Sequence, residues 1–260
     1  MDHRTVNSSR LFATLLCAAA LASCDKNAVQ VLPTEPVVDS RVKFFHFAVG
    51  SPTVPTVNFY ADSTKMTGVV PPATGTAYGA AANGGAYSSI AAGPYTLTGR
   101  ISSGADINRP IATIDTTLAT GKSYSFYMIG LYDAVGKIAD AFVLEDNYPA
   151  QVDYAIAHVR FVHTIGNAAP LTLYAANTVT NDTLTVTGPV AYKSASGFIA
   201  VPEGVYNLFA RYTDSTDNKI TRDAVSFVGG HAYTVGARGN ITVTSTTAST
   251  RPILDNTANR

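Results

Sequence analysis

Two stretches of this 260-residue chain repeat each other, which limits the folds that the chain can adopt. Four short blocks recur in the same order, and their offset shrinks from 117 to 109 residues along the chain. Ordered blocks with a slowly drifting offset are the signature of a duplicated structural unit with small loop deletions. The block pairs are Ser40–His46 with Ala157–His163, Val57–Ala61 with Leu171–Ala175, Ile90–Leu97 with Val201–Leu208, and Gly121–Phe126 with Gly230–Val235.

Each block alternates between apolar and polar residues with a period of two, which is typical of a half-buried strand. Val42, Phe44 and His46 share one face of the first block, whereas Lys43 points the other way, as does Arg160 in the second copy. Glycine-containing turns separate the blocks, and helical periodicity is missing. We therefore predict two tandem immunoglobulin-like, antiparallel β-sandwich domains, at residues 40–148 and 154–258.

The stretch between the two predicted domains is short, from Glu145 to Tyr154, and contains one proline. A connection of this length predicts that the repeats are coupled at a limited angle. The chain carries 18 basic and 18 acidic side chains and has no basic run. Since nucleic-acid binding depends on clustered positive charge, we predict no nucleic-acid partner.

The first residues have the pattern of an export signal. Arg4 and Arg10 precede an apolar run over 11–21, about half the roughly 20 residues that a membrane-spanning helix needs. The sequence Leu-Ala-Ser-Cys over 21–24 follows directly and resembles the processing box of bacterial lipoproteins. This resemblance implies a signal peptide at 1–23, a lipid such as palmitate on Cys24, and a tether at 24–39. The alternative is an ordinary signal peptide with a chance cysteine.

A lipid on Cys24 would make a membrane the first partner of the chain. Cys17 lies in the predicted signal peptide, so Cys24 would have no partner for an intramolecular disulfide in the mature chain. Two or more acyl chains are needed for stable anchoring. The residues around Cys24 resemble the start of lipoproteins from Bacteroidota, which favours the outer membrane over the inner membrane. We expect a location in the cell envelope.

The repeat blocks also resemble a bacterial family, the domain of unknown function DUF4397. The resemblance rests on the opening Val-Arg-Phe-Val-His, the Gly-x-Tyr-x-Leu strand and the Gly-x-x-Tyr-x-Val hairpin, and it extends from about Ser40 to the C-terminus in two copies. Both copies lack the aspartate of the Ser-Pro-Asp-Ala-Pro that often follows the histidine in this family. The family implies an exported, often lipidated protein and brings no activity with it.

Few residues stand out as candidates for function. His46 and His163 end equivalent strands, and we predict that both are buried and hydrogen-bonded to the following loop. Tyr60 and Tyr174 fall on the polar face of equivalent strands, where a tyrosine could bind a sugar or a partner protein, cap the sandwich edge or pack between the repeats.

The pattern of the remaining residues predicts no catalytic site, no metal and no cofactor. The sequence therefore favours a non-enzymatic binding or scaffolding role, with a glycan or an envelope protein as the further partner. Two alternatives remain open, a carbohydrate-recognition module in polysaccharide uptake and a hydrolase with an unrecognised site.

Overall fold

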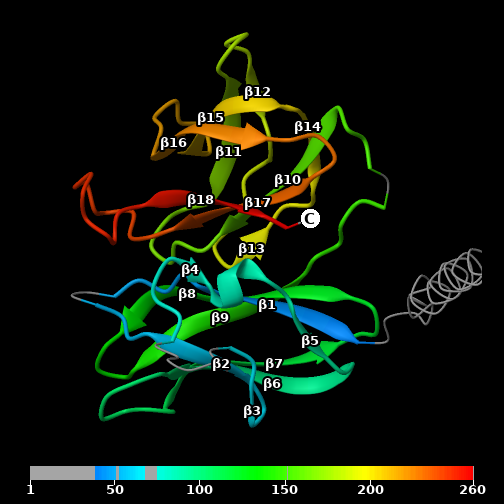
Figure 1. Cartoon of the computed structure of the whole chain (residues 1–260). Coiled ribbons are helices and arrows are strands. Elements are labelled where there is room, and N and C mark those ends of the chain that lie inside the picture. The colour runs from blue at the N-terminus through cyan, green and yellow to red at the C-terminus, as the bar shows by residue number, and fades with distance from the viewer. Residues whose placement is uncertain (1–38, 51–52, 68–74, 151, 260) are drawn as a thin grey trace, which may run out of the picture. The chain divides into compact units, whose positions relative to one another are not determined.

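The computed structural model describes residues 39–50, 53–67, 75–150 and 152–259, which form β-strands and their connections (Figure 1). The predicted all-β class is confirmed. A short 3₁₀ helix, η2 (Ala82–Gly85), lies in the first repeat. The strands of this repeat are β1 (Ser40–His46), β2 (Val57–Ala61), β3 (Thr64–Lys65), β4 (Ala80–Ala81), β5 (Ser88–Ile90), β6 (Gly93–Ile101), β7 (Pro110–Leu118), β8 (Ser123–Asp133) and β9 (Ile138–Glu145).

The second repeat follows the same order of long strands. Its strands are β10 (Ile156–His163), β11 (Leu171–Asn177), β12 (Thr183–Thr185), β13 (Ser194–Ala195), β14 (Ile199–Pro202), β15 (Gly204–Tyr212), β16 (Ile220–Phe227), β17 (Ala232–Arg238) and β18 (Ile253–Ala258). Within the described ranges, no helix has both the length and the apolar character needed to span a bilayer.

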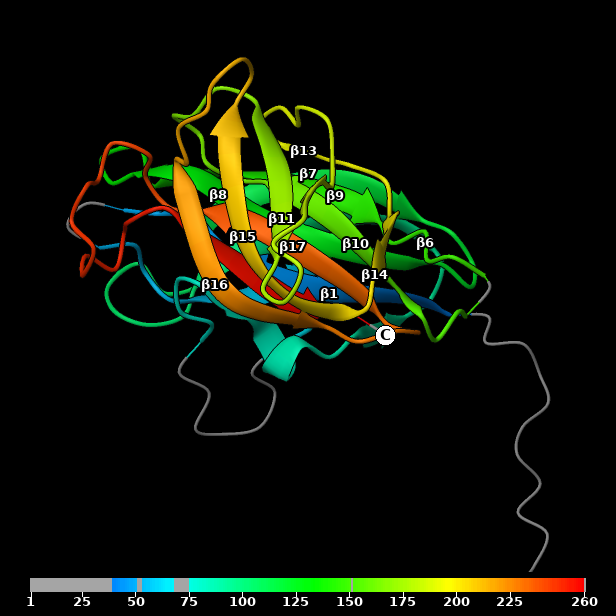
Figure 2. The same cartoon turned by 90° about the horizontal axis from the view of Figure 1, so that it is seen from above.

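Each repeat pairs its strands into two sheets. In the first repeat, β1, β8 and β9 form one sheet with β4 and β5, and β3, β2, β6 and β7 form the other. The second repeat reproduces this arrangement. One of its sheets contains β13, β14, β10, β17 and β18, and the other contains β12, β11, β15 and β16. Figure 2 looks onto the sheet of β12, β11, β15 and β16, in which β15 lies between β11 and β16.

The first strand of each repeat differs from the predicted antiparallel pairing. β1 runs parallel to β8, and β10 runs parallel to β17, while all the other strand pairs of these sheets are antiparallel. The connection after β1 leads into the other sheet, so β1 is not bound to a neighbour by a tight hairpin. It is therefore free to lie alongside β8 in either direction.

The core of each repeat lies between its two sheets. In the first repeat, Phe44 of β1 stacks on Phe59 of β2, with ring centroids 5.1 Å apart, and both are almost fully buried. In the second repeat, Phe161 and Leu173 are fully buried in the equivalent places. Tyr206, in the Gly-x-Tyr-x-Leu block, holds the preceding turn, because its hydroxyl donates to Pro202 O at 2.8 Å.

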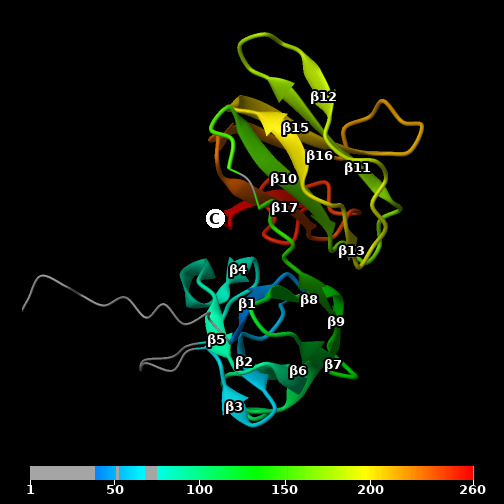
Figure 3. The ribbon, with the colours of Figure 1, turned by 90° about the vertical axis from the view of Figure 1, so that its right-hand side faces the viewer.

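The sheet containing β1 and β8 packs against the sheet containing β10 and β17 (Figure 3). We call these two sheets the inner sheets, and the other two the outer sheets. A third apolar cluster joins the inner sheets, in which Phe45, Tyr127 and Phe142 stack in series beside Val162 of the second repeat. The inner strands thus bury both of their faces, one in the repeat core and one between the repeats.

Candidate functional site

The predicted lipid-attachment residue, Cys24, and nearly all of the predicted tether lie outside the described residues. The other candidates lie on different sheets. Tyr60 and Tyr174 belong to the outer sheets, whereas His46 and His163 belong to the inner sheets. The structure therefore does not combine the tyrosines and histidines into one site.

Each of the two tyrosines is half-buried and lies beneath an arginine. The guanidinium carbon of Arg100 lies 4.4 Å from the ring centroid of Tyr60, and that of Arg211 lies 5.0 Å from the ring centroid of Tyr174. Arg100 and Arg211 occupy equivalent positions at the ends of β6 and β15. Phe209 stacks beside Tyr174 with ring centroids 5.5 Å apart, which extends the second pair.

Sequence reasoning missed both arginines. Each lies on a strand adjacent to its tyrosine, about 40 residues away in the sequence. Their recurrence in the repeat could have revealed them, because Arg100 and Arg211 both follow the Gly-x-Tyr-x-Leu block by three residues. The pairing of tyrosine with arginine is thus a shared feature of the two outer sheets.

The two histidines are fully buried and bind the loop that follows their own strand, as predicted. His46 Nε2 lies 3.0 Å from Pro55 O, and His163 Nε2 lies 3.2 Å from Ala169 O. The Ile165 amide also donates to His163 Nδ1, so His163 is neutral with its proton on Nε2. Among the described residues, no group of three His, Cys, Asp or Glu side chains is close enough to hold a metal ion.

We expect the folded protein to lose stability as the pH falls from about 6.5 to about 4. Burial lowers the pKa of His46 from 6.5 to about 4 and also lowers that of His163. The unfolded chain therefore binds more protons than the folded chain in this window, which favours unfolding. His46 alone accounts for about 3 kcal/mol once both states have titrated.

Urea denaturation at a series of pH values measures this effect. The His46→Gln variant should show a flatter pH dependence, whereas Val179→Ala, at an exposed position, should leave the slope as it is. An equal slope for wild type and His46→Gln would contradict the assignment.

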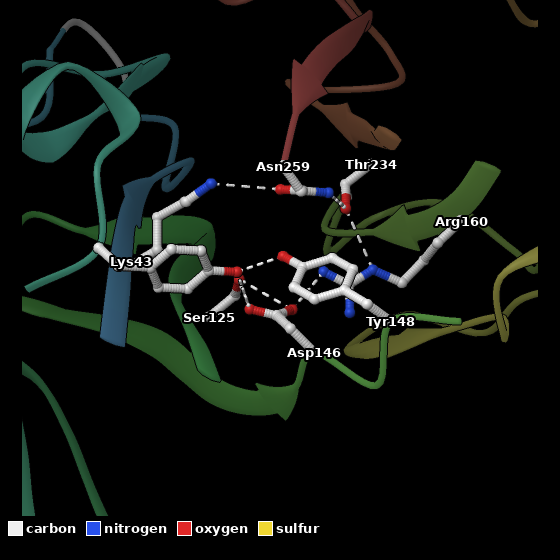
Figure 4. A network of polar contacts seen from close by, with 8 residues as sticks. Lys43, Ser125, Asp146, Tyr148, Arg160, Thr234 and Asn259 are labelled. Atoms are coloured by element: carbon white, nitrogen blue, oxygen red, sulfur yellow. Dashed lines mark hydrogen bonds and ion pairs between the residues drawn. The ribbon is translucent and has the colours of Figure 1, made fainter. Parts of the chain in front are cut away.

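A network of buried and partly buried polar side chains joins the inner sheets (Figure 4). Asp146 accepts hydrogen bonds from Ser125 at 2.8 Å, from Tyr87 at 2.6 Å and from Arg160 of the second repeat at 2.5 Å. The Asp146 carboxylate is fully buried, and only 3% of the Arg160 side chain is exposed. Tyr87 also bonds to Tyr148, and its pKa is raised by burial and by the neighbouring Asp146.

Comparison with known families identifies the second repeat. The family model described as "Domain of unknown function (DUF4397)" matches residues 157–260. Residues 157–260 belong to the DUF4397 family. The match confirms the resemblance for the second repeat, whereas the first repeat lies outside it.

Other comparisons are more distant. No curated protein shows significant similarity to the chain. Among solved structures, the Bacillus anthracis TIE protein is 10% identical with a TM-score of 0.24, and the alignment covers 77% of this chain. The chain spans 34% of the length of that protein. A structure described as a cell adhesion protein from Bacteroides ovatus is 10% identical with a TM-score of 0.21, and the alignment covers 85% of this chain and 95% of that one.

The DUF4397 domain and the first repeat contribute equivalent side chains to the polar network. Lys43 of β1 corresponds to Arg160 of β10, and Ser125 of β8 corresponds to Thr234 of β17. Asp146 directly follows β9, just as Asn259 directly follows β18. The cation of each repeat bonds to the residue after the last strand of the other, so the contact has approximate two-fold symmetry.

Glycine at position 236 of the DUF4397 domain makes room for an aromatic ring of the first repeat. A Cβ atom at Gly236 would lie 2.9 Å from Cε2 of Phe47, closer than side chains tolerate. Phe47 is buried, and its ring is tilted against that of Phe45, with ring centroids 5.4 Å apart. The absence of a side chain at position 236 therefore lets the inner sheets approach each other.

Proposed function

We propose that the chain is a lipoprotein of the bacterial cell envelope, anchored through lipid on Cys24, with a non-catalytic binding or scaffolding role. The observation that carries this proposal is the Leu-Ala-Ser-Cys sequence at 21–24, directly after a basic and then apolar leader. The similarity of this region to Bacteroidota lipoproteins favours the outer membrane. Because two or more acyl chains give stable attachment, the lipid would hold the folded repeats at the membrane surface.

The anchor predicts a complete loss of lipid labelling in the Cys24→Ala variant. Cells expressing the full chain are grown with labelled palmitate, and the purified protein is tested for incorporated label. The Cys17→Ala variant is the matched control, because Cys17 would be removed with the signal peptide and label should persist. Continued labelling of Cys24→Ala, or an intact amino terminus on exported protein, would refute the proposal.

The binding role is supported by the paired tyrosines and arginines of the outer sheets. The inner sheets are occupied by their mutual contact, so the outer sheets are the faces that present these residues to a ligand. Tyr60 with Arg100 and Tyr174 with Arg211 combine aromatic surface, hydrogen-bonding groups and positive charge. An envelope protein or a glycan with acidic groups suits this combination.

A carbohydrate-recognition role in polysaccharide uptake is the second candidate, because tyrosine stacks on sugar rings and arginine binds carboxylates. A glycan and peptide array probed with the chain from residue 25 onward separates the two classes of ligand. A glycan role predicts at least about tenfold weaker binding, roughly 1.4 kcal/mol, when Tyr60 and Tyr174 are both replaced by Ala. Replacement of the exposed Tyr154 by Phe is the control. Undiminished binding by the double variant would exclude these tyrosines.

A further inference from the structure

Lys43 lies in an unusual environment for a lysine. Its side chain is buried, with 2% of the residue exposed, and its Nζ lies 4.5 Å from the ring centroid of Tyr87. Nζ donates a hydrogen bond to Asn259 Oδ1 at 3.3 Å, so the amine and a side-chain carboxamide are in contact (Figure 4). These two residues lie 216 positions apart, on the first strand of the first repeat and just after the last strand of the second.

The charges of the network do not balance if Lys43 is protonated. Two basic residues, Lys43 and Arg160, are buried around a single carboxylate, that of Asp146. Arg160 holds this carboxylate at 2.5 Å, and no carboxylate among the described residues lies within ion-pairing distance of Lys43. Burial lowers the pKa of Lys43, and the nearby Arg160 lowers it further against the opposing effect of Asp146. An unpaired buried ammonium is costly, so this site favours the neutral, nucleophilic amine.

The equivalent contact, from Arg160 of the second repeat to Asp146 of the first, provides an internal comparison. There the basic residue is Arg160, which stays protonated at any ordinary pH, and it faces the carboxylate of Asp146. Lysine, which can lose its proton, instead faces the uncharged carboxamide of Asn259. The two contacts therefore differ in both partners. Arg160 and Asp146 form an ion pair, whereas Lys43 and Asn259 place an amine beside an amide.

We propose that Lys43 and Asn259 form an intramolecular isopeptide bond. The neutral Nζ attacks Cγ of Asn259, a new Nζ–Cγ bond forms, the Cγ–Nδ2 bond breaks, and Nδ2 leaves as ammonia. The proton that Nζ loses balances the one that the leaving nitrogen gains, so no oxidant, reductant or co-reactant is needed.

Thr234 is placed to assist the leaving group. Its Oγ1 accepts hydrogen bonds from Asn259 Nδ2 at 2.6 Å and from Arg160 Nε at 3.1 Å. The hydroxyl proton of Thr234 is thus available to the departing nitrogen, and the adjacent guanidinium makes that hydroxyl more acidic. Lys43 and Thr234 are buried and Asn259 is partly buried, which limits the access of water that would otherwise compete for the carboxamide.

The bond would remove the unpaired charge and connect the two ends of the folded region covalently. After the reaction, Arg160 and Asp146 remain as one balanced ion pair. β1 of the first repeat would then be joined to the segment that follows β18. The crosslink would hold the inner sheets together even under a pulling force.

Tryptic digestion of the purified full chain with mass spectrometry tests this proposal. Trypsin does not cleave at a modified lysine, and it does not cleave between Arg251 and Pro252. We expect one branched peptide that joins residues 42–65 to residues 239–260 and is lighter than their sum by one ammonia. Intact wild-type protein should show the same mass deficit.

Two variants and one control complete the test. Lys43→Arg keeps the positive charge but has no attacking amine, and Asn259→Ala removes the carboxamide, so each should lose the deficit completely. Lys122→Arg, which changes an exposed lysine paired with Glu145, should retain it. Cleavage after Lys43 and an unmodified mass in folded wild-type protein would overturn the proposal and establish an ordinary hydrogen bond.

Discussion

Replacing Asp146 with alanine is expected to lower the free energy of unfolding by about 3–5 kcal/mol, because it leaves the buried Arg160 without a counter-ion. The Asp146 carboxylate is fully buried and bonds to Ser125, Tyr87 and Arg160. Its removal also takes away the acceptor of the buried Ser125 hydroxyl and one of the two hydrogen bonds of the Tyr87 hydroxyl. Guanidinium denaturation followed by circular dichroism measures the loss.

Asp140→Ala is the matched control for this experiment. Asp140 also binds a cation of the second repeat, since its carboxylate lies 2.7 Å from Lys193 Nζ. Both of these side chains are more than 40% exposed, so solvent screens the pair and its loss should cost no more than about 1 kcal/mol. Equal effects of the two substitutions would show that burial of Asp146 contributes nothing to stability.

Replacing Phe161 with alanine is expected to cost about 3–5 kcal/mol, because it opens a cavity in the core of the second repeat. Phe161 is fully buried on β10, between the two sheets of its repeat. β10 also carries Arg160 and Val162, which contact the first repeat. We therefore expect the defect to destabilise the contact between the repeats as well as the core.

Calorimetry of Phe161→Ala and of the equivalent Phe44→Ala distinguishes coupled from separate unfolding. If the inner sheets couple the repeats, each variant should show one transition at a lower temperature. Two transitions, with only the altered repeat shifted, would mean that the repeats unfold independently. Val179→Ala, at a position that is 84% exposed, should stay within about 0.5 kcal/mol of wild type.

Local patterns were sufficient to predict the strands of the four repeated blocks in each repeat. The alternation through Val42, Phe44 and His46 predicted which face of β1 lies in the core, and the structure confirms it. The loop contacts of the two histidines were predictable for the same reason, because the partner atoms lie 9 and 6 residues away in the sequence.

The short connection predicts that the repeats are coupled, but the residues that form their contact were not predicted, since they are distant in the sequence. Lys43 and Arg160 were interpreted as pointing away from the core, and they do, but the surface they reach is covered by the other repeat. Asp146 lies in the stretch that the sequence predicts to connect the repeats. One signal was present, because the neighbouring Phe45 and Val162 give the same strand faces apolar character.

The approximate two-fold symmetry of the inner sheets raises the question of which repeats can pack against each other, two unlike repeats or two like ones. Tyr127 holds the position in the first repeat that Gly236 holds in the second, so two first halves brought together would set Phe47 against Tyr127. Two second halves would bury a pair of Arg160 guanidinium groups opposite Asn259, with no carboxylate between them. Divergence after the duplication has thus made the surface selective for pairing of a first repeat with a second repeat, which disfavours contact between like repeats of neighbouring copies.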